Sequence, residues 1–257
     1  MAHRLNEQGI KVCYTLEGKP VPSVDTINLP GYEKSQPVVT GNAAGTQHQH
    51  GVYGDIFQSA SLFVEAGSIL DQNSVSVLSR IADECADRWR QPDSGIWELE
   101  ELQHYTMSKI SCWQALFRAV QLAEKGHLSS TRVARWSRER DRIESWVNEH
   151  CWSERMQAFT FYPGTDRLDA SMTLEAYFGF PHAERLSLMC SAIQRTCSMV
   201  RGSTAIPVLR AKREHLSVAR SGWRSLLPKL AAGLRRPGSW TKHLPPFLRG
   251  RDPERDD

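Results

Sequence analysis

The residues best suited to chemistry in this chain are a tryptophan and a carboxylate that stand side by side, Trp97 and Glu98. They follow residues 92–95, a Pro-Asp-Ser-Gly run whose residue types mark a turn. We therefore expect the pair in a loop that leads toward a helix, a common position for a reactive carboxylate. Taken alone, the pair has a simpler interpretation as an ordinary solvated surface carboxylate beside an incidental aromatic residue.

A helix is predicted directly after this loop. From Met107 onward the apolar residues recur with the i, i+3, i+4, i+7 spacing of an amphipathic helix. They are Ile110, Trp113, Leu116, Phe117, Val120 and Ala123.

Two histidines upstream invite comparison with a metal site. His48 and His50 are only two residues apart, so their side chains diverge on a helix, and no further ligands stand at zinc-like spacing. We therefore predict no metal and no cofactor.

Four segments stand in order along the chain: GY, SQPV and GNAA at 31–32, 35–38 and 41–44; VYGD at 52–55; GIWE, HY, SK and CW at 95–98, 104–105, 108–109 and 112–113; and FY, GTD and LDAS at 161–162, 164–166 and 168–171. Together they resemble glycoside hydrolase family 15, the glucoamylase/trehalase-like enzymes. The resemblance implies an all-α fold, part of an (α/α)6 toroid of helical hairpins with short strand or hairpin segments. It also implies inverting hydrolysis of α-glucosidic bonds.

The resemblance implies a role for each member of the Trp-Glu pair. Cleavage of an acetal needs a proton on the leaving oxygen, and Glu98 matches the family's general acid. Trp97 would stack on the sugar and lower the local dielectric, which raises the pKa of a carboxyl group toward the range an acid catalyst needs.

Five more polar residues are candidates for contacts with an α-glucoside or oligosaccharide substrate. For each of them a purely structural role, such as a salt bridge, a helix cap or core packing, is an equally good interpretation. They are Tyr53, Asp93, His104, Lys109 and Asp169.

The chain also departs from the family pattern. Gly51 stands where the family has Asp, and Glu100 and Glu101 follow the Trp-Glu pair in place of other polar residues. Sequence resembling the family's N-terminal β-sandwich, its first hairpin and its general-base motif is not found. We therefore expect a partial catalytic domain over residues 1–198.

Composition favours a globular, non-membrane protein. The 257 residues are 40% apolar and 24% charged, and contain no apolar run of the ~18 residues that a membrane helix needs. Residues 1–9 lack the apolar region of a signal peptide. Six cysteines fall mostly within apolar helical patterns, which is typical of buried thiols in a reducing cytoplasm. They are Cys13, Cys85, Cys112, Cys151, Cys190 and Cys197.

The remaining chain is predicted as alternating helices and short strands. We expect a strand or hairpin within residues 1–28, a helix over 52–67, and a helix capped by Asn73 or Ser74 that ends before Pro92. A further helix opens at Ser129 and Ser130, and its mixed charges indicate a solvated face. A strand over 158–162, a turn at 163–164 and a helix over 170–177 complete the prediction.

The last 59 residues differ in character. Residues 199–257 contain 13 Lys and Arg against five Asp and Glu, a net charge of +8, and six prolines interrupt them. Such a tail is irregular, and nucleic acid or an anionic membrane is one interpretation of its charge. We prefer the hypothesis that it is a frameshifted reading of the same gene, so neither partner is expected.

Three interpretations of the whole chain remain open. The first is a cytoplasmic enzyme of the glucoamylase/trehalase type with Glu98 as its acid. The second is an inactive, truncated remnant without a general base. The third is a carbohydrate-binding module that keeps a sugar cleft.

Overall fold

The computed structural model describes residues 10–172, together with residues 174, 179–182, 184–185, 188–189 and 191–193. The chain divides into two compact units, Met1–Val147 and Asn148–Asp257. The predicted tail at 199–257, and with it the predicted boundary at residue 198, lies outside the described residues, as do Cys190 and Cys197.

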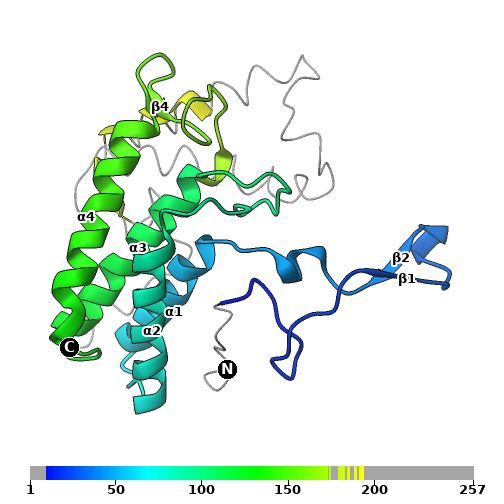
Figure 1. The fold of residues 1–257 in the computed structure, drawn as a ribbon, viewed down its shortest axis with the longest axis horizontal. Helices are drawn as coiled ribbons and strands as arrows, with labels where there is room; N and C mark the ends of the chain where they lie inside the picture. The colour runs from blue at the N-terminus through cyan, green and yellow to red at the C-terminus, as the bar shows by residue number, and fades with distance from the viewer. Residues whose placement is uncertain are drawn as a thin grey trace, which may run out of the picture. The chain divides into compact units, whose positions relative to one another are not determined.

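Four α-helices dominate the described residues (Figure 1). They are α1 (Gly51–Glu65), α2 (Gln72–Arg88), α3 (Thr106–Glu124) and α4 (Val133–His150). Each falls where apolar periodicity predicts a helix. Among the described residues, no helix combines the length and hydropathy needed to cross a bilayer.

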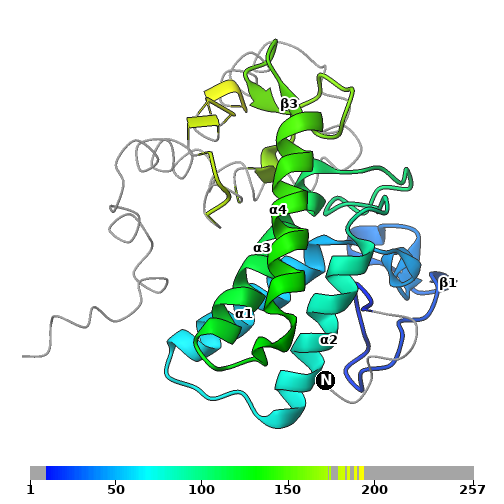
Figure 2. The ribbon, with the colours of Figure 1, turned by 60° about the vertical axis from the view of Figure 1, so that its left-hand side comes forward.

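Helix α3 lies at the centre of the first unit, with α1 and α2 packed against it (Figure 2). Every residue from Thr106 to Leu116 is buried, so this half of the helix is covered on all sides rather than along one stripe. At Gly54 of α1 the two helices are in close contact: an added Cβ would lie 2.8 Å from Gln114 Oε1 and 3.0 Å from the carbonyl oxygen of Ser111. A glycine at this position lets α1 and α3 come together.

The helix ends confirm most of the predicted boundaries and correct one. Gly126, with φ of +80°, follows α3, and the Ser129 side chain accepts a hydrogen bond from Thr131 N in the 3-10 turn η4 (Ser130–Arg132) before α4. The predicted cap of α2 is wrong. Asp71 caps the helix by accepting from Ser74 N at 2.6 Å, because a carboxylate three residues ahead of that N–H reaches it better than the helical Asn73 or Ser74 can.

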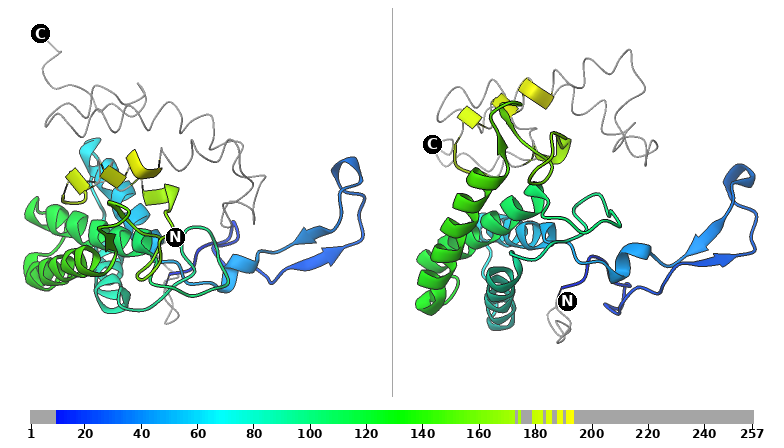
Figure 3. Two further views of the ribbon diagram at one scale, coloured as in Figure 1. Left: turned by 90° about the horizontal axis from the view of Figure 1, so that it is seen from above. Right: turned by 45° about the horizontal axis from the view of Figure 1, so that its top comes forward.

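The N-terminal hairpin lies later in the chain than the alternation of apolar residues suggests. Strand β1 (Asp25–Ile27) pairs antiparallel with β2 (Val38–Thr40), and Asp25 faces Thr40 (Figure 3). Short 3-10 turns η2 (Tyr32–Lys34) and η3 (Ala43–Thr46) flank β2. Upstream, within residues 10–24, Tyr14 and Pro20 form an isolated bridge around a turn in which Gly18 N donates to the carbonyl of Thr15.

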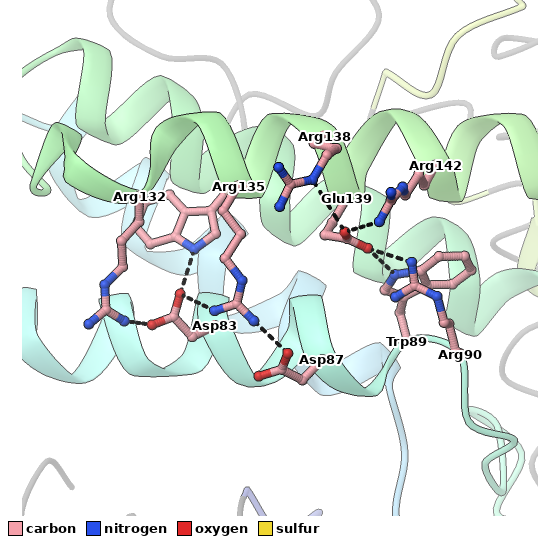
Figure 4. Close-up of polar contacts among 10 residues, drawn as sticks. Asp83, Asp87, Trp89, Arg90, Arg132, Arg135, Arg138, Glu139 and Arg142 are labelled. Atoms are coloured by element: carbon pink, nitrogen blue, oxygen red, sulfur yellow. Dashed lines mark hydrogen bonds and ion pairs between the residues drawn. The ribbon is translucent and has the colours of Figure 1, made fainter.

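The charged run of α4 is not simply a solvated face, which corrects the prediction. Glu139 is 6% exposed and accepts hydrogen bonds from the Trp89 indole N–H (3.1 Å), Arg90 (2.7 Å) and Arg142 (2.7 Å) (Figure 4). Burial opposes ionisation of Glu139, but these hydrogen bonds outweigh it and lower its pKa.

A second carboxylate joins the same two helices further along. Asp83 of α2 accepts from Arg135 (3.1 Å) and from the indole N–H of Trp136 (3.0 Å), and it also pairs with Arg132. Part of the charged run therefore bonds α4 to α2 and to the residues just after it.

The second unit contains a small antiparallel pair, β3 (Trp152–Ser153) and β4 (Ala158–Phe159). The strand predicted over 158–162 is thus shorter than expected, and the turn at Pro163 and Gly164 is confirmed. The helix predicted over 170–177 begins as a 3-10 turn, η5 (Ala170–Met172), and part of its remainder lies outside the described residues.

Candidate active site

Two loops of the first unit meet where the predicted acid lies. One is residues 47–50, directly before α1, and the other is residues 93–98, which precede α3. Ser94 N donates to the carbonyl of His48 (3.0 Å), and His50 N donates to Asp93 Oδ2 (2.9 Å). These two bonds fix the register of one loop against the other.

The turn that carries Glu98 is closed by its own backbone. Glu98 N donates to the carbonyl of Gly95 (3.2 Å), and Leu99 N donates to the carbonyl of Ser94 (3.0 Å). Glu98 has a φ of +55°, in the left-handed region, at a position of such turns that glycine usually occupies. The loop thus holds Glu98 in a conformation that L-residues rarely adopt.

Gly95 is required by both its backbone and its surroundings. Its φ is +64°, and an added Cβ would lie 2.8 Å from Cδ2 of Tyr105. The Tyr105 hydroxyl in turn donates to the carbonyl of Glu101 (2.7 Å). The aromatic ring therefore supports the turn from its buried side.

Asp93 anchors the loop from within. Its side chain is 0% exposed, and Oδ2 accepts from His50 N and from Ser108 Oγ (2.8 Å). Its backbone exchanges two hydrogen bonds with Gln103. Burial raises the pKa of Asp93, and the hydrogen bonds from His50 and Ser108 oppose that rise.

Lys109 is also fully buried. Its ammonium donates to the carbonyls of Trp89 (2.6 Å) and Gln91 (2.5 Å), just beyond the end of α2. Helix ends leave carbonyls without intrahelical partners, and a lysine is suited to them by charge and by donor number.

Two histidine rings, His48 and His50, lie side by side, and His50 lies near Asp93. The rings of His48 and His50 lie 4.6 Å apart, and His50 Nδ1 lies 4.0 Å from Asp93 Oδ1. Burial, together with the charge of Lys109, lowers the pKa of His50 to about 2, and burial lowers the pKa of His48 and His104 as well. The described residues contain no group of three potential ligands that could hold a metal ion.

Tyr53 and Asp169 each have a polar partner within their own unit. Tyr53 is 1% exposed, and its hydroxyl donates to Glu84 Oε1 (3.1 Å), which ties α1 to α2. Asp169 belongs to the second unit, where its carboxylate accepts from the backbone N–H and the hydroxyl of Ser171 at η5. The Tyr53 hydroxyl and the Asp169 carboxylate are thus both engaged in hydrogen bonds within the protein.

Of the predicted residues, the structure brings Asp93, Trp97, Glu98, His104 and Lys109 to one loop and the first turn of α3. Among them Glu98 is exposed and Trp97 and His104 are half-buried, while Asp93 and Lys109 lie beneath. Sequence reasoning missed Gln47, Ser94 and Ser108 as members of the site. The one sequence signal for these three residues is that they lie within or next to the segments that resemble the family. Hydrogen bonds between loops far apart in the sequence leave no local sequence pattern.

The described helices thus support a turn that presents an exposed carboxylate beside a half-buried aromatic side chain. The chain belongs to the family described as Glycosyl hydrolases family 15, whose sequence model matches residues 2–205. The predicted family is thereby confirmed.

Solved structures support the same fold. A glycosidase and a glycosidase solved in complex with glucose each superimpose with a TM-score of 0.51 at 17% identity, over 65% of this chain and 46% of theirs. The predicted fold class, an all-α part of an (α/α)6 toroid, is confirmed.

Relatives by sequence are trehalases. The chain is 36% identical over 167 residues to a trehalase of Mycobacterium tuberculosis and 35% identical over 159 residues to one of Mycolicibacterium smegmatis. These alignments cover 64% and 61% of this chain. The chain spans about a quarter of the length of these two relatives (24% and 23%). Trehalase 2 of Sulfolobus acidocaldarius is 26% identical over 81% of the chain and 36% of its own length.

Proposed function

We propose that this chain carries the acid half of an α-glucoside hydrolase site, with Glu98 as general acid and trehalose as the substrate. One observation carries the proposal. Glu98 is exposed and held at a φ of +55° by a turn whose supporting residues are buried and hydrogen-bonded. Strained backbone that its surroundings over-determine is typical of functional positions. The trehalase names of the relatives support the choice of substrate.

The chemistry follows from the carboxyl group and its neighbour. Protonated Glu98 would donate its proton to the glycosidic oxygen as the bond to the anomeric carbon breaks. The half-buried indole of Trp97 would present a flat apolar face to the sugar ring. Inversion requires a second carboxyl, about 6.5–9.5 Å away, to activate water on the opposite face of the sugar. We assign that second carboxyl to no residue of this chain.

The buried polar residues of this site form hydrogen bonds with backbone atoms and hold the loop in place. Asp93 and Lys109 have no exposed surface, so we propose that they position the loop and do not bind sugar. Tyr53 has the same kind of role between α1 and α2. His104 is half-buried beside the same loop and remains a proposed sugar contact. Asp169 is buried and accepts from Ser171, so we propose a structural role for it.

A sugar-binding module without hydrolysis is the second candidate. The chain spans about a quarter of the length of its trehalase relatives, and turnover needs a second carboxyl, which we assign to no residue of this chain. Both candidates predict that trehalose binds near Trp97, and they differ in whether glucose is released.

The experiment is glucose release from trehalose, maltose and short α-glucans by the purified chain, with Glu98→Gln as the paired variant. Inverting cleavage of maltose releases β-glucose first, which proton NMR distinguishes from the α-anomer. Release that Glu98→Gln abolishes supports the enzyme. Calorimetric binding of trehalose without release supports the binding module, and neither binding nor release refutes both.

We propose the cytoplasm as the compartment. Among the described residues Cys13, Cys85, Cys112 and Cys151 are free thiols, as expected in a reducing environment. Fractionation of cells that express the chain tests this assignment.

A further inference from the structure

We propose that Gln47 is a positioning residue for Glu98: its side-chain amide holds the carbonyl of Glu98 and so maintains the left-handed backbone that presents the acid. This inference rests on the proposed function of Glu98. Gln47 Nε2 donates to the Glu98 carbonyl oxygen at 3.2 Å, across 51 positions of sequence. This bond connects loop 47–50 directly to the acid residue.

The orientation of the Gln47 amide is determined by its other neighbour. Gln49 Nε2 donates to Gln47 Oε1 at 3.0 Å, so the oxygen of the Gln47 amide is already occupied as an acceptor. Its NH2 group must then face the carbonyl of Glu98, because a carbonyl can only accept. Two hydrogen bonds thus run in series: Gln49 donates to Gln47, and Gln47 donates to Glu98.

The hydrogen bond from Gln47 is comparable in free energy with the cost of the left-handed backbone at Glu98. A left-handed conformation costs an L-residue roughly 1–2 kcal/mol. A neutral hydrogen bond contributes a net stabilisation of about 0.5–1.5 kcal/mol. The two energies are comparable, so loss of the Gln47 bond would let Glu98 populate other backbone conformations. The Glu98 carboxyl would then leave its working position in part of the molecules.

Gln47 acts on position rather than on ionisation. Its amide contacts the backbone carbonyl of Glu98 and not the side-chain carboxyl group. Removal of the amide should therefore lower kcat and leave the alkaline limb of the pH profile, which reports the pKa of a general acid, where it is. A small misplacement of a catalytic group can cost about 10- to 100-fold in rate.

The test uses the full chain with Gln47→Met, which keeps the length of the side chain and removes the donor. Gln36→Met is the matched control, because Gln36 Nε2 donates to the carbonyl of Leu29 at 2.9 Å, a bond of the same kind in the β1–β2 hairpin. Melting temperatures are measured for both variants to show that each is folded.

A spectroscopic readout reports the contact without any need for activity. Labelling of glutamate carbonyl carbons and leucine amide nitrogens selects Glu-Leu pairs, and the sequence has two, at 98–99 and 101–102. Glu98→Gln identifies the first signal by removing it. We expect Gln47→Met to shift the signal of Glu98 and Leu99 and to leave that of Glu101 and Leu102 in place. Gln36→Met should shift neither.

The outcomes separate this inference from the proposed function. A shifted signal, with kcat on trehalose about tenfold lower and KM unchanged, supports it. An unmoved signal, an unchanged kcat, or a displaced alkaline limb overturns it. If the unmodified chain releases no glucose, the proposed enzyme fails, and the signal of Glu98 alone then decides whether Gln47 holds its backbone.

Discussion

The buried ammonium of Lys109, in α3, donates a 2.6 Å hydrogen bond to the backbone carbonyl of Trp89, the residue that follows α2. The same ammonium donates to the carbonyl of Gln91 at 2.5 Å. One side chain therefore closes the end of a neighbouring helix and fixes where the loop with Trp97 and Glu98 begins.

Replacement of Lys109 by methionine should destabilise the chain strongly. Methionine fills a similar volume but leaves both carbonyls without their charged donor, at a cost of about 2–4 kcal/mol in the free energy of unfolding. Urea denaturation followed by tryptophan fluorescence measures the change. Lys125→Met, at an exposed position after α3, is the control, and a loss below 1 kcal/mol at Lys109, by the approximate scale of buried hydrogen bonds, would contradict the assigned role.

Gly54→Ala should destabilise the contact between α1 and α3. The new methyl group would lie 2.8 Å from Gln114 Oε1 and 3.0 Å from a backbone oxygen, so we expect a loss of about 1–3 kcal/mol in the free energy of unfolding.

Gly51→Ala, in the same helix, is its matched control. An added Cβ at Gly51 meets nothing within 4 Å, and alanine is the better helix former by roughly 0.5–1 kcal/mol. Thermal unfolding should thus move in opposite directions for the two variants. A shift in the same direction would show that helix propensity, rather than packing, governs position 54.

His50→Phe should reduce the loss of stability at low pH. Burial lowers the pKa of His50 to about 2 from an ordinary 6.5, so as pH falls below 6.5 the unfolded chain takes up a proton that the folded chain refuses. The stability that neutral His50 provides is present above pH 6.5 and is lost as pH falls from 6.5 toward 2. At two pH units below 6.5 the loss amounts to about 2–3 kcal/mol.

Phenylalanine keeps a ring against Tyr53, whose ring centroid lies 6.0 Å from that of His50, and it cannot titrate. Within the described part of the chain neither ring nitrogen of His50 has a hydrogen-bond partner, so the substitution breaks no such bond. Unfolding free energies at pH 7.5 and pH 4.5 measure the effect, with the value at pH 7.5 as internal reference. Parallel pH curves for the two proteins would disprove the prediction.

Glu98→Gly should abolish glucose release and raise stability. Glycine removes the left-handed penalty of roughly 1–2 kcal/mol, partly offset by about 0.5–1 kcal/mol of added chain entropy in the unfolded state. The net gain is about 0.5–1 kcal/mol. Glu100→Gly, at an exposed position whose φ is not positive, should lose stability. A less stable Glu98→Gly chain would mean that the turn is not strained at this residue.

Much of the fold could be predicted because its signals are local. The spacing of Ile110, Trp113 and Leu116 indicates a helix wherever that segment lies, and Gly126 marks its end in the same way. The predicted cap of α2 was wrong because Asp71, Asn73 and Ser74 are all good cap residues, and only the observed backbone shows that Ser74 N–H points to Asp71. Periodicity placed Glu139 on a polar face, but it gave no sign that Trp89 and Arg90 cover that face.

The sequence by itself determined the family, the helical elements and the pairing of Trp97 with Glu98 on a turn before a helix. Only the tertiary structure decided that Asp93 and Lys109 lie beneath that turn, that Tyr53 bonds to Glu84, and that Gln47 reaches the carbonyl of Glu98. The physical reason is the range of the interactions. Turn and helix preferences act over a few residues, whereas the bond from Gln47 to Glu98 joins loops 51 positions apart, which meet only when α1 packs on α3.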